Sequence, residues 1–230
     1  MKTLSEELRD FSNEMSKNIP SEALTTIISE IDKLSKSGIV ENALNVGDKV
    51  PDFELEDSYG NVISLDSMVA LGPAVISFNR GNWCPFCNID FKHLQKNVAA
   101  IEKSGSNLFV ISPQLKEKSA QLKEENGYEY PILHDSHNKV AKQFGICFTL
   151  SDELKTIHKS FGMDISGHNG EATFELPIPA TYVVNQNKEI VYAYINPNWM
   201  ERAQIEDVKK VIYKLTLQCD LYRYANTNGR

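Results

Sequence analysis

The stretch that decides the fold is Phe78-Asn79-Arg80-Gly81-Asn82-Trp83-Cys84-Pro85-Phe86-Cys87. It follows an apolar run, Ala74 to Phe78, typical of a buried strand, and it leads into an amphipathic helix expected from about Pro85 towards Lys103. Cys84 therefore stands at a helix N-terminus, where unpaired backbone N–H groups and the helix dipole favour a thiolate over a thiol. Two thiols at C-x-x-C spacing can close and reopen a small disulfide ring, which is the minimum equipment for redox chemistry.

Composition narrows the class of protein. The chain of 230 residues is 41% hydrophobic and 24% charged, and its formal net charge of -7 argues against a broad nucleic-acid surface. No run approaches the roughly 18 apolar residues that a membrane-spanning helix needs. The first residues, Met1 to Glu7, carry acids where a signal peptide would have a continuous apolar stretch. These features predict a cytoplasmic protein that binds neither nucleic acid nor a membrane.

Apolar periodicity on both sides of this stretch predicts an α/β fold. Strands and helices alternate, which favours a partly parallel sheet with helices on both faces, and a final antiparallel hairpin makes the sheet mixed. The expected helices cover residues 4–15, 24–34, 114–125, 138–144 and 203–217, and the expected strands cover residues 108–111, 131–134, 180–184 and 190–194. A β-hairpin is expected from Phe53 to Leu65. Residues 150–179 do not fit the alternation, and there we expect one helix, at about 152–161, within a long flexible insertion.

The two N-terminal helices precede the redox stretch, and the chain is expected to have three parts. Residues 1–45 form a helical extension, residues 46–220 the main domain, and residues 221–230 a polar tail that frays. The apolar faces of the N-terminal helices must be covered by the main domain or by a second subunit. The extension is therefore expected to serve packing or dimerisation, and a homodimer is one possible assembly.

The four cysteines also admit interpretations without redox chemistry. A C-x-x-C pair can be half of a zinc site or two inert core thiols, but Cys147 and Cys219 stand alone and supply no second ligand pair. We therefore favour redox chemistry and expect neither a metal nor a cofactor. Cys147 is expected to be a buried small hydrophobe rather than a resolving thiol. Cys219 is expected to be structural or idle, with a bridge to another subunit as the minor alternative.

Four motifs together resemble a known family. They are Gly47-Asp48-Lys49-Val50-Pro51-Asp52-Phe53, the stretch from Phe78 to Cys87, Val140-Ala141-Lys142-Gln143-Phe144-Gly145-Ile146, and Pro179-Ala180-Thr181-Tyr182-Val183-Val184-Asn185. In these motifs the chain from Val46 to Leu217 is similar to the alkyl hydroperoxide reductase/thiol-specific antioxidant group, the peroxiredoxin-like branch of the thioredoxin-fold superfamily. The resemblance implies a thioredoxin-like α/β fold, in which a central mixed β-sheet is flanked by helices.

The active-site residues depart from that family. Cys87 stands at the position of its peroxidatic cysteine, Cys84 at its threonine and Arg80 at its proline. Pro179 stands where peroxiredoxins carry an arginine that binds the peroxide. Thioredoxins instead have their nucleophile at the Cys84 position and a cis-proline at the Pro179 position. That likeness implies a cis Ile178–Pro179 bond and an extended backbone edge, beside the two thiols, for an incoming disulfide.

These residues have candidate roles at the site. Disulfide exchange needs an exposed thiolate and a second thiol that releases the mixed disulfide. Cys84 is the expected nucleophile, Arg80 adds positive charge, and Cys87 is the more buried resolving thiol. With a peroxide as the oxidant, either thiol could attack first, and Arg80 could orient the peroxide. Substrate-binding positions are expected at Trp83, Pro179 and Thr181.

Three functions fit these expectations. The first, favoured by the whole-domain resemblance, is a thiol-dependent antioxidant peroxide reductase whose Cys84/Cys87 dithiol–disulfide cycle is regenerated by thioredoxin or another thiol donor. The second is a protein thiol–disulfide oxidoreductase of the thioredoxin type, with Cys84 as nucleophile and a protein disulfide as substrate. The third is a redox-sensing interaction module without enzymatic activity, in which the state of the two thiols changes a partner surface.

Overall fold

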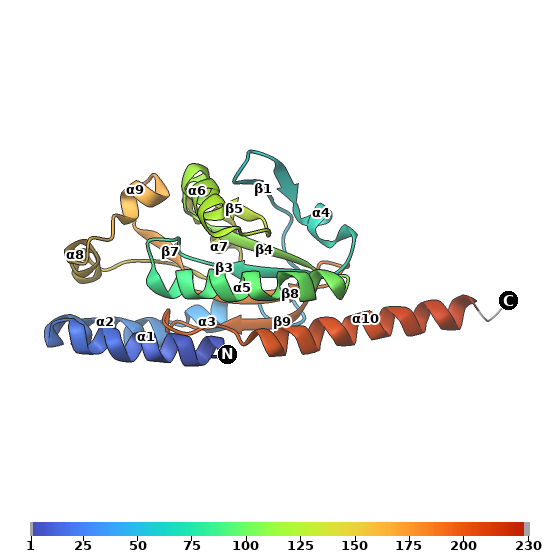
Figure 1. Ribbon diagram of the computed structural model, residues 1–230, viewed down its shortest axis with the longest axis horizontal. Coiled ribbons are helices and arrows are strands. Elements are labelled where there is room, and N and C mark those ends of the chain that lie inside the picture. The colour runs from blue at the N-terminus through green and yellow to red at the C-terminus, as the bar shows by residue number, and fades with distance from the viewer. Residues whose placement is uncertain (1, 228–230) are drawn as a thin grey trace.

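The computed structural model describes the backbone of residues 2–227 and the side chains of residues 2–217. The strands of its main sheet are β1 (Glu54–Asp57), β2 (Val62–Ser64), β3 (Ala74–Phe78), β4 (Asn107–Ser112), β5 (Ile132–His134), β8 (Ala180–Val184) and β9 (Ile190–Ile195). They form a seven-stranded sheet in the order β2-β1-β5-β4-β3-β8-β9 (Figure 1). β3, β4 and β5 are parallel to one another, and the other neighbours are antiparallel. The expected mixed α/β sheet is confirmed.

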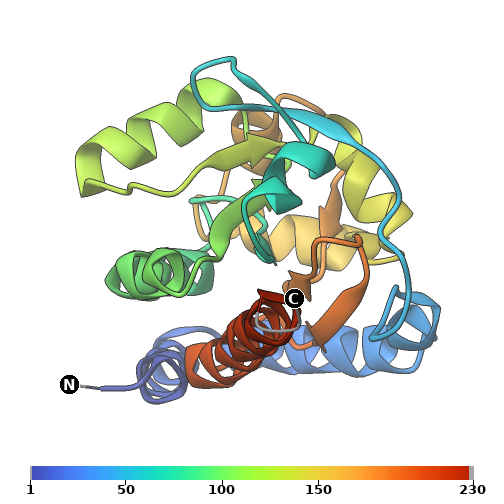
Figure 2. The same cartoon turned by 90° about the vertical axis from the view of Figure 1, so that its right-hand side faces the viewer.

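Helices cover both faces of this sheet. They are α1 (Leu4–Asn18), α2 (Ser21–Ser35), α3 (Ile39–Asn42), α4 (Leu65–Ala70), α5 (Pro85–Lys103), α6 (Lys116–Asn126), α7 (Lys139–Gln143), α8 (Asp152–Ser160), α9 (Ile165–Asn169) and α10 (Ile205–Thr227), with a 3₁₀ turn at Ser136–Asn138. Successive side chains of β3 point to opposite faces. Val75 joins the core formed with α1, α5 and α10, whereas Ile76 joins the core formed with α4 and α7. Figure 2 shows α1, α5 and α10 close together towards the lower left of the view.

The predicted N-terminal hairpin is formed by α1 and α2. Thr3 caps α1 through a capping box with Glu6, and Pro20 separates the two helices. The ring of Phe11 meets the ring of Phe86 on α5 edge to face, with centroids 5.1 Å apart. The main domain therefore covers the apolar face of α1 within a single chain, and α2 packs on α8.

The structure differs from the sequence-based expectation in its short elements. The hairpin strand expected to reach Leu65 ends at Ser64, because Ser64 caps the unpredicted helix α4 through a reciprocal bond with Ser67. The short helix α3 was also not expected. The insertion at 150–179 is more ordered than expected, since α9 and a strand, β7 (Glu175–Pro177), follow α8. β7 pairs antiparallel with β6 (Cys147–Thr149), outside the main sheet.

The last helix is longer than the sequence indicates. α10 continues past its expected end at Leu217 and projects from the body of the molecule (Figure 1). The part of the expected polar tail up to Thr227 is therefore helical, and residues 228–230 lie outside the described range. Across residues 2–227, no helix combines the length and apolar character that crossing a bilayer requires.

Candidate redox site

The C-x-x-C pair lies at the junction between β3 and α5. Cys84 is the N-cap of α5, and Pro85 occupies the first turn, where the N–H that it lacks would have no partner inside the helix. The loop before the helix is fixed by neighbouring polar groups. The Asn82 N–H donates to Oε1 of Gln114 at 2.6 Å, and Nδ2 of Asn88 donates to the Asn82 carbonyl at 2.8 Å. The predicted placement of Cys84 at a helix N-terminus is confirmed.

Gly81 is needed for the shape of this loop. Its φ of +124° is a conformation that side chains disfavour, and a Cβ there would lie 2.8 Å from Nε1 of Trp83. The absence of a side chain lets the Trp83 indole fold back over the loop. That packing brings the indole face to 5.2 Å from the Arg80 guanidinium carbon.

Arg80 contacts the first thiol directly. Its Nη2 donates a hydrogen bond to Sγ of Cys84 at 3.0 Å, and the guanidinium also lies over the ring of Trp199, 5.3 Å from its centroid. Arg80 is only 2% exposed, although it is charged. Arg80 therefore lies against the thiol to which it is expected to add positive charge, and Trp83 packs against the cation inside the site rather than forming an open platform.

A second arginine, which sequence reasoning missed, contacts the other thiol. Nη2 of Arg202 donates to Sγ of Cys87 at 3.1 Å, and its Nε lies 3.2 Å from Oδ2 of Asp90, one helical turn beyond Cys87. Nη1 donates to the carbonyls of Trp199 and Glu201, which hold the guanidinium in place. The only sequence signal was an arginine three residues after a tryptophan, in a segment that reads as a plain turn.

The two thiols have opposite electrostatic environments. Burial alone would raise the pKa of Cys84, but a hydrogen bond from Cys87 and the positive charges of Arg80 and Arg202 outweigh it and hold that pKa well below its usual range. Burial raises the pKa of Cys87 well above its usual range, and the hydrogen bond with Cys84 and its charge add to the increase. These directions favour a thiolate at Cys84 and a protonated thiol at Cys87.

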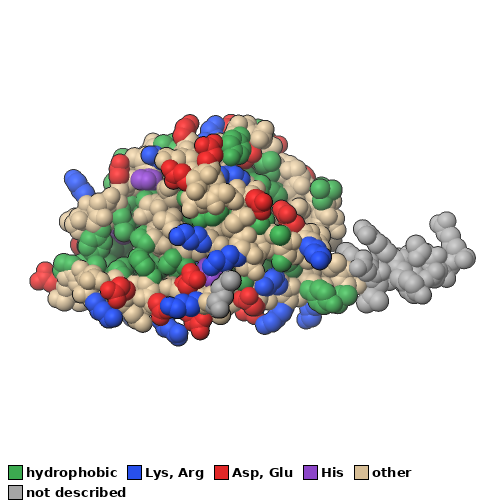
Figure 3. Space-filling model, in the orientation of Figure 1, with side chains coloured by type: hydrophobic (Ala, Val, Ile, Leu, Met, Phe, Trp, Pro, Cys, Tyr) green, Lys and Arg blue, Asp and Glu red, His purple; other side chains and the backbone are tan. Residues whose placement is uncertain are grey.

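Both thiols are more enclosed than expected. Cys84 is 1% exposed, so the expectation of an exposed nucleophile is wrong. It borders a cavity of about 40 Å³ whose wall is mostly apolar and includes Met15, Ile27, Ile157, Phe161, Met163 and Met200. These residues come from α1, α2, α8 and the segments that follow α8 and precede α10. Figure 3 shows hydrophobic side chains gathered at a hollow between α8 and the α1–α2 hairpin.

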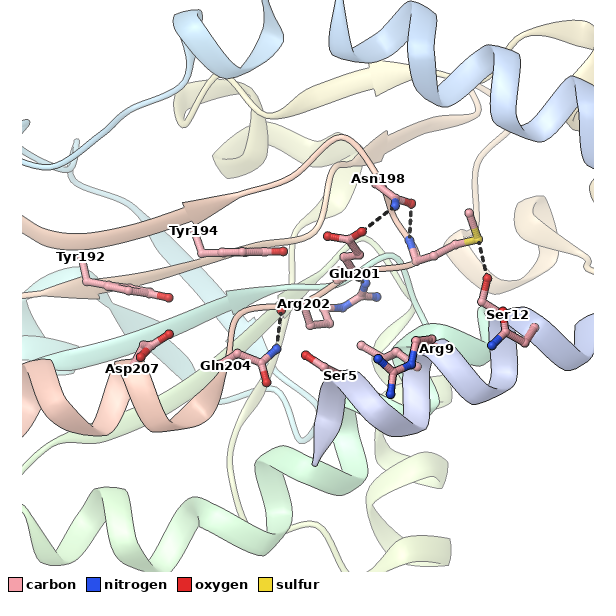
Figure 4. A pocket seen from close by; sticks show the side chains of 13 residues that line it. Ser5, Arg9, Ser12, Tyr192, Tyr194, Asn198, Glu201, Arg202, Gln204 and Asp207 are labelled. Carbon is pink, nitrogen blue, oxygen red and sulfur yellow. Dashed lines mark hydrogen bonds between the residues drawn. The ribbon is translucent and has the colours of Figure 1, made fainter. Parts of the chain in front are cut away.

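A larger cavity, of about 500 Å³, is also lined by Arg202 (Figure 4). Its polar lining includes Ser5 and Ser12 of α1, Tyr192 and Tyr194 of β9, and Asp207 of α10. Neither Cys84 nor Cys87 lines it. The smaller cavity is therefore the one at the reactive sulfur.

Comparisons with known proteins identify the family of this chain. A family model described as the AhpC/TSA family matches residues 46–193. The chain belongs to the AhpC/TSA family. A candidate peroxiredoxin of Mycobacterium tuberculosis is 31% identical over 120 residues, covering 51% of this chain and 76% of that protein. Peroxiredoxin Bcp of Escherichia coli is 28% identical over 130 residues, covering 55% and 83%. Among solved structures, peroxidoxin BcpB of Mycobacterium tuberculosis has a TM-score of 0.60 at 22% identity, covering 74% of this chain and 96% of that one.

Pro179 occupies a different setting from the one that a thioredoxin implies. None of the peptide bonds between residues 2 and 227 is cis, so the expected cis Ile178–Pro179 bond is wrong. The chain runs on from β7 into β8 here, and a trans bond is the intrinsically preferred form. The Ile178 N–H donates to the Ile146 carbonyl at 2.8 Å, and the Pro179 carbonyl accepts from Asn196 at 3.4 Å. The backbone edge expected to receive a disulfide is therefore already paired.

The remaining expected site residues do not line the cavity beside Cys84. Thr181 is buried in β8, paired with Ser77 and Tyr194, and neither it nor Pro179 lines the cavity beside Cys84. Cys147 is half-buried in β6, and burial raises its pKa to about 12, which keeps it protonated at neutral pH. Cys219 has its side chain outside the described residues.

Much of the AhpC/TSA site comes from outside the residues that the family model matches. Met15 and Ile27 precede that match, and Trp199, Met200 and Arg202 follow it. The matched domain supplies the two thiols and Arg80. The flanking segments supply the second arginine and part of the cavity wall. The site is therefore built from the matched domain together with segments on both sides of it.

Proposed function

We propose that this AhpC/TSA chain is an antioxidant peroxidase in which Cys84 reduces a hydroperoxide and Cys87 resolves the product. One observation carries the proposal. A thiolate at Cys84, held 3.0 Å from Nη2 of Arg80, borders a small apolar cavity and has a protonated thiol beside it. A nucleophile, a cation and a second thiol are the groups that peroxide reduction needs.

The proposed cycle consists of attack on the peroxide, formation of the Cys84–Cys87 disulfide and reduction by an external donor. The Cys84 thiolate attacks one peroxide oxygen, the O–O bond breaks, and the other oxygen leaves as an alkoxide or hydroxide that takes up a proton. The Arg80 guanidinium offsets the negative charge on the leaving oxygen. The Cys87 sulfur then attacks the Cys84 sulfenic acid and water leaves, which gives the Cys84–Cys87 disulfide. Two thiols of an external donor return the pair to the dithiol and form a disulfide of their own.

The order of attack follows from the two environments. The resemblance to the family puts Cys87 at the peroxidatic position, but Cys84 has the lowered pKa and borders the cavity. Cys87 has the raised pKa, does not border the cavity, and lies one turn into α5. We therefore assign the first attack to Cys84, with Arg80 as the group that orients the peroxide.

Exchange with protein disulfides uses the same two thiols and is the weaker candidate. In the reduced protein, which is the state that a substrate disulfide must meet, Cys84 is enclosed by the α1–α2 hairpin and α8, so a folded protein disulfide has little access to it. The edge at Ile178 and Pro179 is also paired within the chain. A peroxide needs neither an open groove nor a free backbone edge.

The proposal extends to the domains, the partners and the compartment. We infer that residues 46–220 form the catalytic domain and that residues 1–45 cover its reactive cysteine. The proposed reductant is thioredoxin or another thiol donor. The cytoplasm maintains such donors in reduced form, and it is the compartment that we propose.

Two matched variants test the assignment. In Cys87→Ser, one equivalent of hydrogen peroxide should convert Cys84 into a sulfenic acid that persists and is trapped by dimedone, because the resolving thiol is missing. In Cys84→Ser, Cys87 should react no faster than free cysteine. Stopped-flow kinetics and mass spectrometry of the trapped adduct provide the readout. Fast reaction of Cys84→Ser would assign the attack to Cys87, and slow reaction of the wild type would remove peroxide reduction altogether.

A further inference from the structure

The buried charges around the two thiols are balanced in a particular way. Arg202 has a carboxylate partner, since its Nε lies 3.2 Å from Oδ2 of Asp90. Arg80 has none: among residues 2–217, no carboxylate lies within ion-pair distance of its guanidinium, and its one hydrogen-bond acceptor is the Cys84 sulfur. An unpaired charge is costly to bury, so the Cys84 thiolate is the counterion of Arg80.

Donor groups at the cavity remain free. The Nε and Nη1 atoms of Arg80 are buried without a hydrogen-bond acceptor, and so is Nε1 of Trp83. Both side chains line the cavity of about 40 Å³ beside Cys84, and Arg80 is 2% exposed. A buried polar group without a partner is uncommon in folded proteins and calls for an explanation. Unused N–H donors on a buried cation at a cavity are the chemistry of an anion site.

Disulfide formation removes the counterion. A sulfur in the Cys84–Cys87 bond carries no charge, so Arg80 stays buried as a cation without an anion. We propose that oxidation converts Arg80, together with Trp83, into a binding site for the thiolate of the reductant, which takes over the place of the Cys84 thiolate. This inference rests on the disulfide of the proposed cycle and adds the group that the oxidised state binds.

The reduction step is consistent with this site. The bound thiolate attacks Sγ of Cys84, forming a mixed disulfide, and the Cys84–Cys87 bond breaks with its electron pair on Cys87. The leaving Cys87 thiolate is 3.1 Å from Nη2 of Arg202 in the present arrangement and takes up a proton. A second thiolate attacks the donor's sulfur in the mixed disulfide. That attack releases the donor as its own disulfide and returns Cys84 to Arg80 as a thiolate.

Thiocyanate is a suitable probe, because it is a small monovalent anion with a terminal sulfur and does not reduce disulfides. Trp83 and Trp199 are the only two tryptophans in the chain, and both lie over Arg80, so intrinsic fluorescence reports on this site. Titration with thiocyanate should give a saturable fluorescence change in the oxidised protein, with an affinity at least tenfold lower in the reduced protein. Mass spectrometry of the same samples confirms the disulfide.

A matched pair of variants separates the site from general attraction. Arg80→Gln should lose the saturable change in the oxidised state. Lys159→Gln removes one positive charge from the exposed end of α8, and this variant should still show the saturable fluorescence change. Equal affinity in both redox states, or binding retained in Arg80→Gln, would overturn the proposal. A disulfide that never forms would overturn the proposed cycle, and this site with it, so the two failures are distinguishable.

A second measurement needs no variant. Thiocyanate should slow reduction of the wild-type disulfide competitively with the thiol donor. Dithiothreitol and reduced thioredoxin are tested in separate arms. Competition with both shows that small and protein thiolates use the site, and competition with one identifies the source that does. Absence of competition in both arms would overturn the proposal.

Discussion

Arg202 donates a hydrogen bond to Cys87 at 3.1 Å, although the two residues are 115 positions apart in the chain. The contact brings the segment before α10 onto the first turn of α5 and gives the resolving thiol a cation of its own. Together with the Arg80–Cys84 contact, it assigns one arginine to each sulfur.

Replacing Arg202 should slow resolution more than oxidation. Arg202→Gln removes the cation that stabilises a thiolate at Cys87, and a charge-assisted hydrogen bond of about 1.5–3 kcal/mol corresponds to about a ten- to hundredfold slower condensation. The Cys84 sulfenic acid should accumulate and be trapped by dimedone in otherwise intact protein. Condensation at the wild-type rate would contradict this role.

The same change should also reduce stability. Arg202→Gln leaves Asp90 buried without its ion-pair partner, which costs about 3–5 kcal/mol in the free energy of unfolding. Asp90→Asn in the same chain removes the unpaired charge, so the double variant should regain part of that loss while condensation stays slow. Urea unfolding of the single and double variants measures the difference.

The thiolate of Cys84 should persist to a lower pH than the thiolate of an ordinary cysteine. Because its pKa is lowered, the thiolate remains as the pH falls past the value of about 8.5 at which an ordinary cysteine is half-protonated, and it protonates only at a lower pH. The ultraviolet absorbance of the thiolate in Cys87→Ser, minus that of a Cys84→Ser/Cys87→Ser double variant, isolates this titration. Adding Arg80→Gln should move the midpoint to higher pH. A midpoint at the ordinary value would contradict the lowered pKa.

Loosening α1 should expose the reactive cysteine. Phe11→Ala removes the ring that packs on Phe86 and forfeits its packing energy, about 0.5–1.5 kcal/mol beyond the buried area. Alkylation of Cys84 by iodoacetamide should then be faster than in the wild type. Lys17→Ala, at an exposed position of the same helix, serves as the control and should react at the wild-type rate. Equal rates in all three proteins would show that α1 does not limit access.

A side chain at Gly81 should displace Trp83 from Arg80. In Gly81→Ala the new methyl group would lie 2.8 Å from Nε1 of Trp83, at a backbone φ of +124° that alanine disfavours. The indole must move, so tryptophan fluorescence should change and the peroxide reaction of Cys84 should slow. Asn82→Ala alters the neighbouring residue of the loop without a clash and provides the comparison. Wild-type fluorescence and kinetics in Gly81→Ala would refute the packing role of Gly81.

Local signals explain why the β3–α5 unit could be predicted. The apolar run at 74–78 and Pro85 each specify structure through neighbours in sequence, and the strand and helix bounds agree with those expected. The position of Cys84 at the helix N-terminus follows from these local signals. Elements of three to six residues, such as α3, α4 and β7, depend on tertiary contacts that periodicity does not reveal.

The enclosure of the site could not be predicted from the same signals. Arg202 reaches Cys87 only because α10 and α5 pack side by side, and the walls formed by Met15 and Ile27 require α1 and α2 to fold back onto the main domain. Hydrophobic periodicity indicates that these helices bury a face, but it does not identify the surface that they cover. Residue types alone therefore predict a solvent-exposed Cys84, whereas the packed chain buries it.

The 115 positions between Cys87 and Arg202 also have a consequence for the nascent chain. Synthesis at about 5–20 residues per second leaves roughly 6–23 s between the two residues. During that interval the C-x-x-C pair has left the ribosome without its second arginine or the wall from Trp199. A newly made molecule therefore passes through a stage in which its most reactive sulfur lacks part of its enclosure, and premature oxidation at that stage competes with completion of the fold.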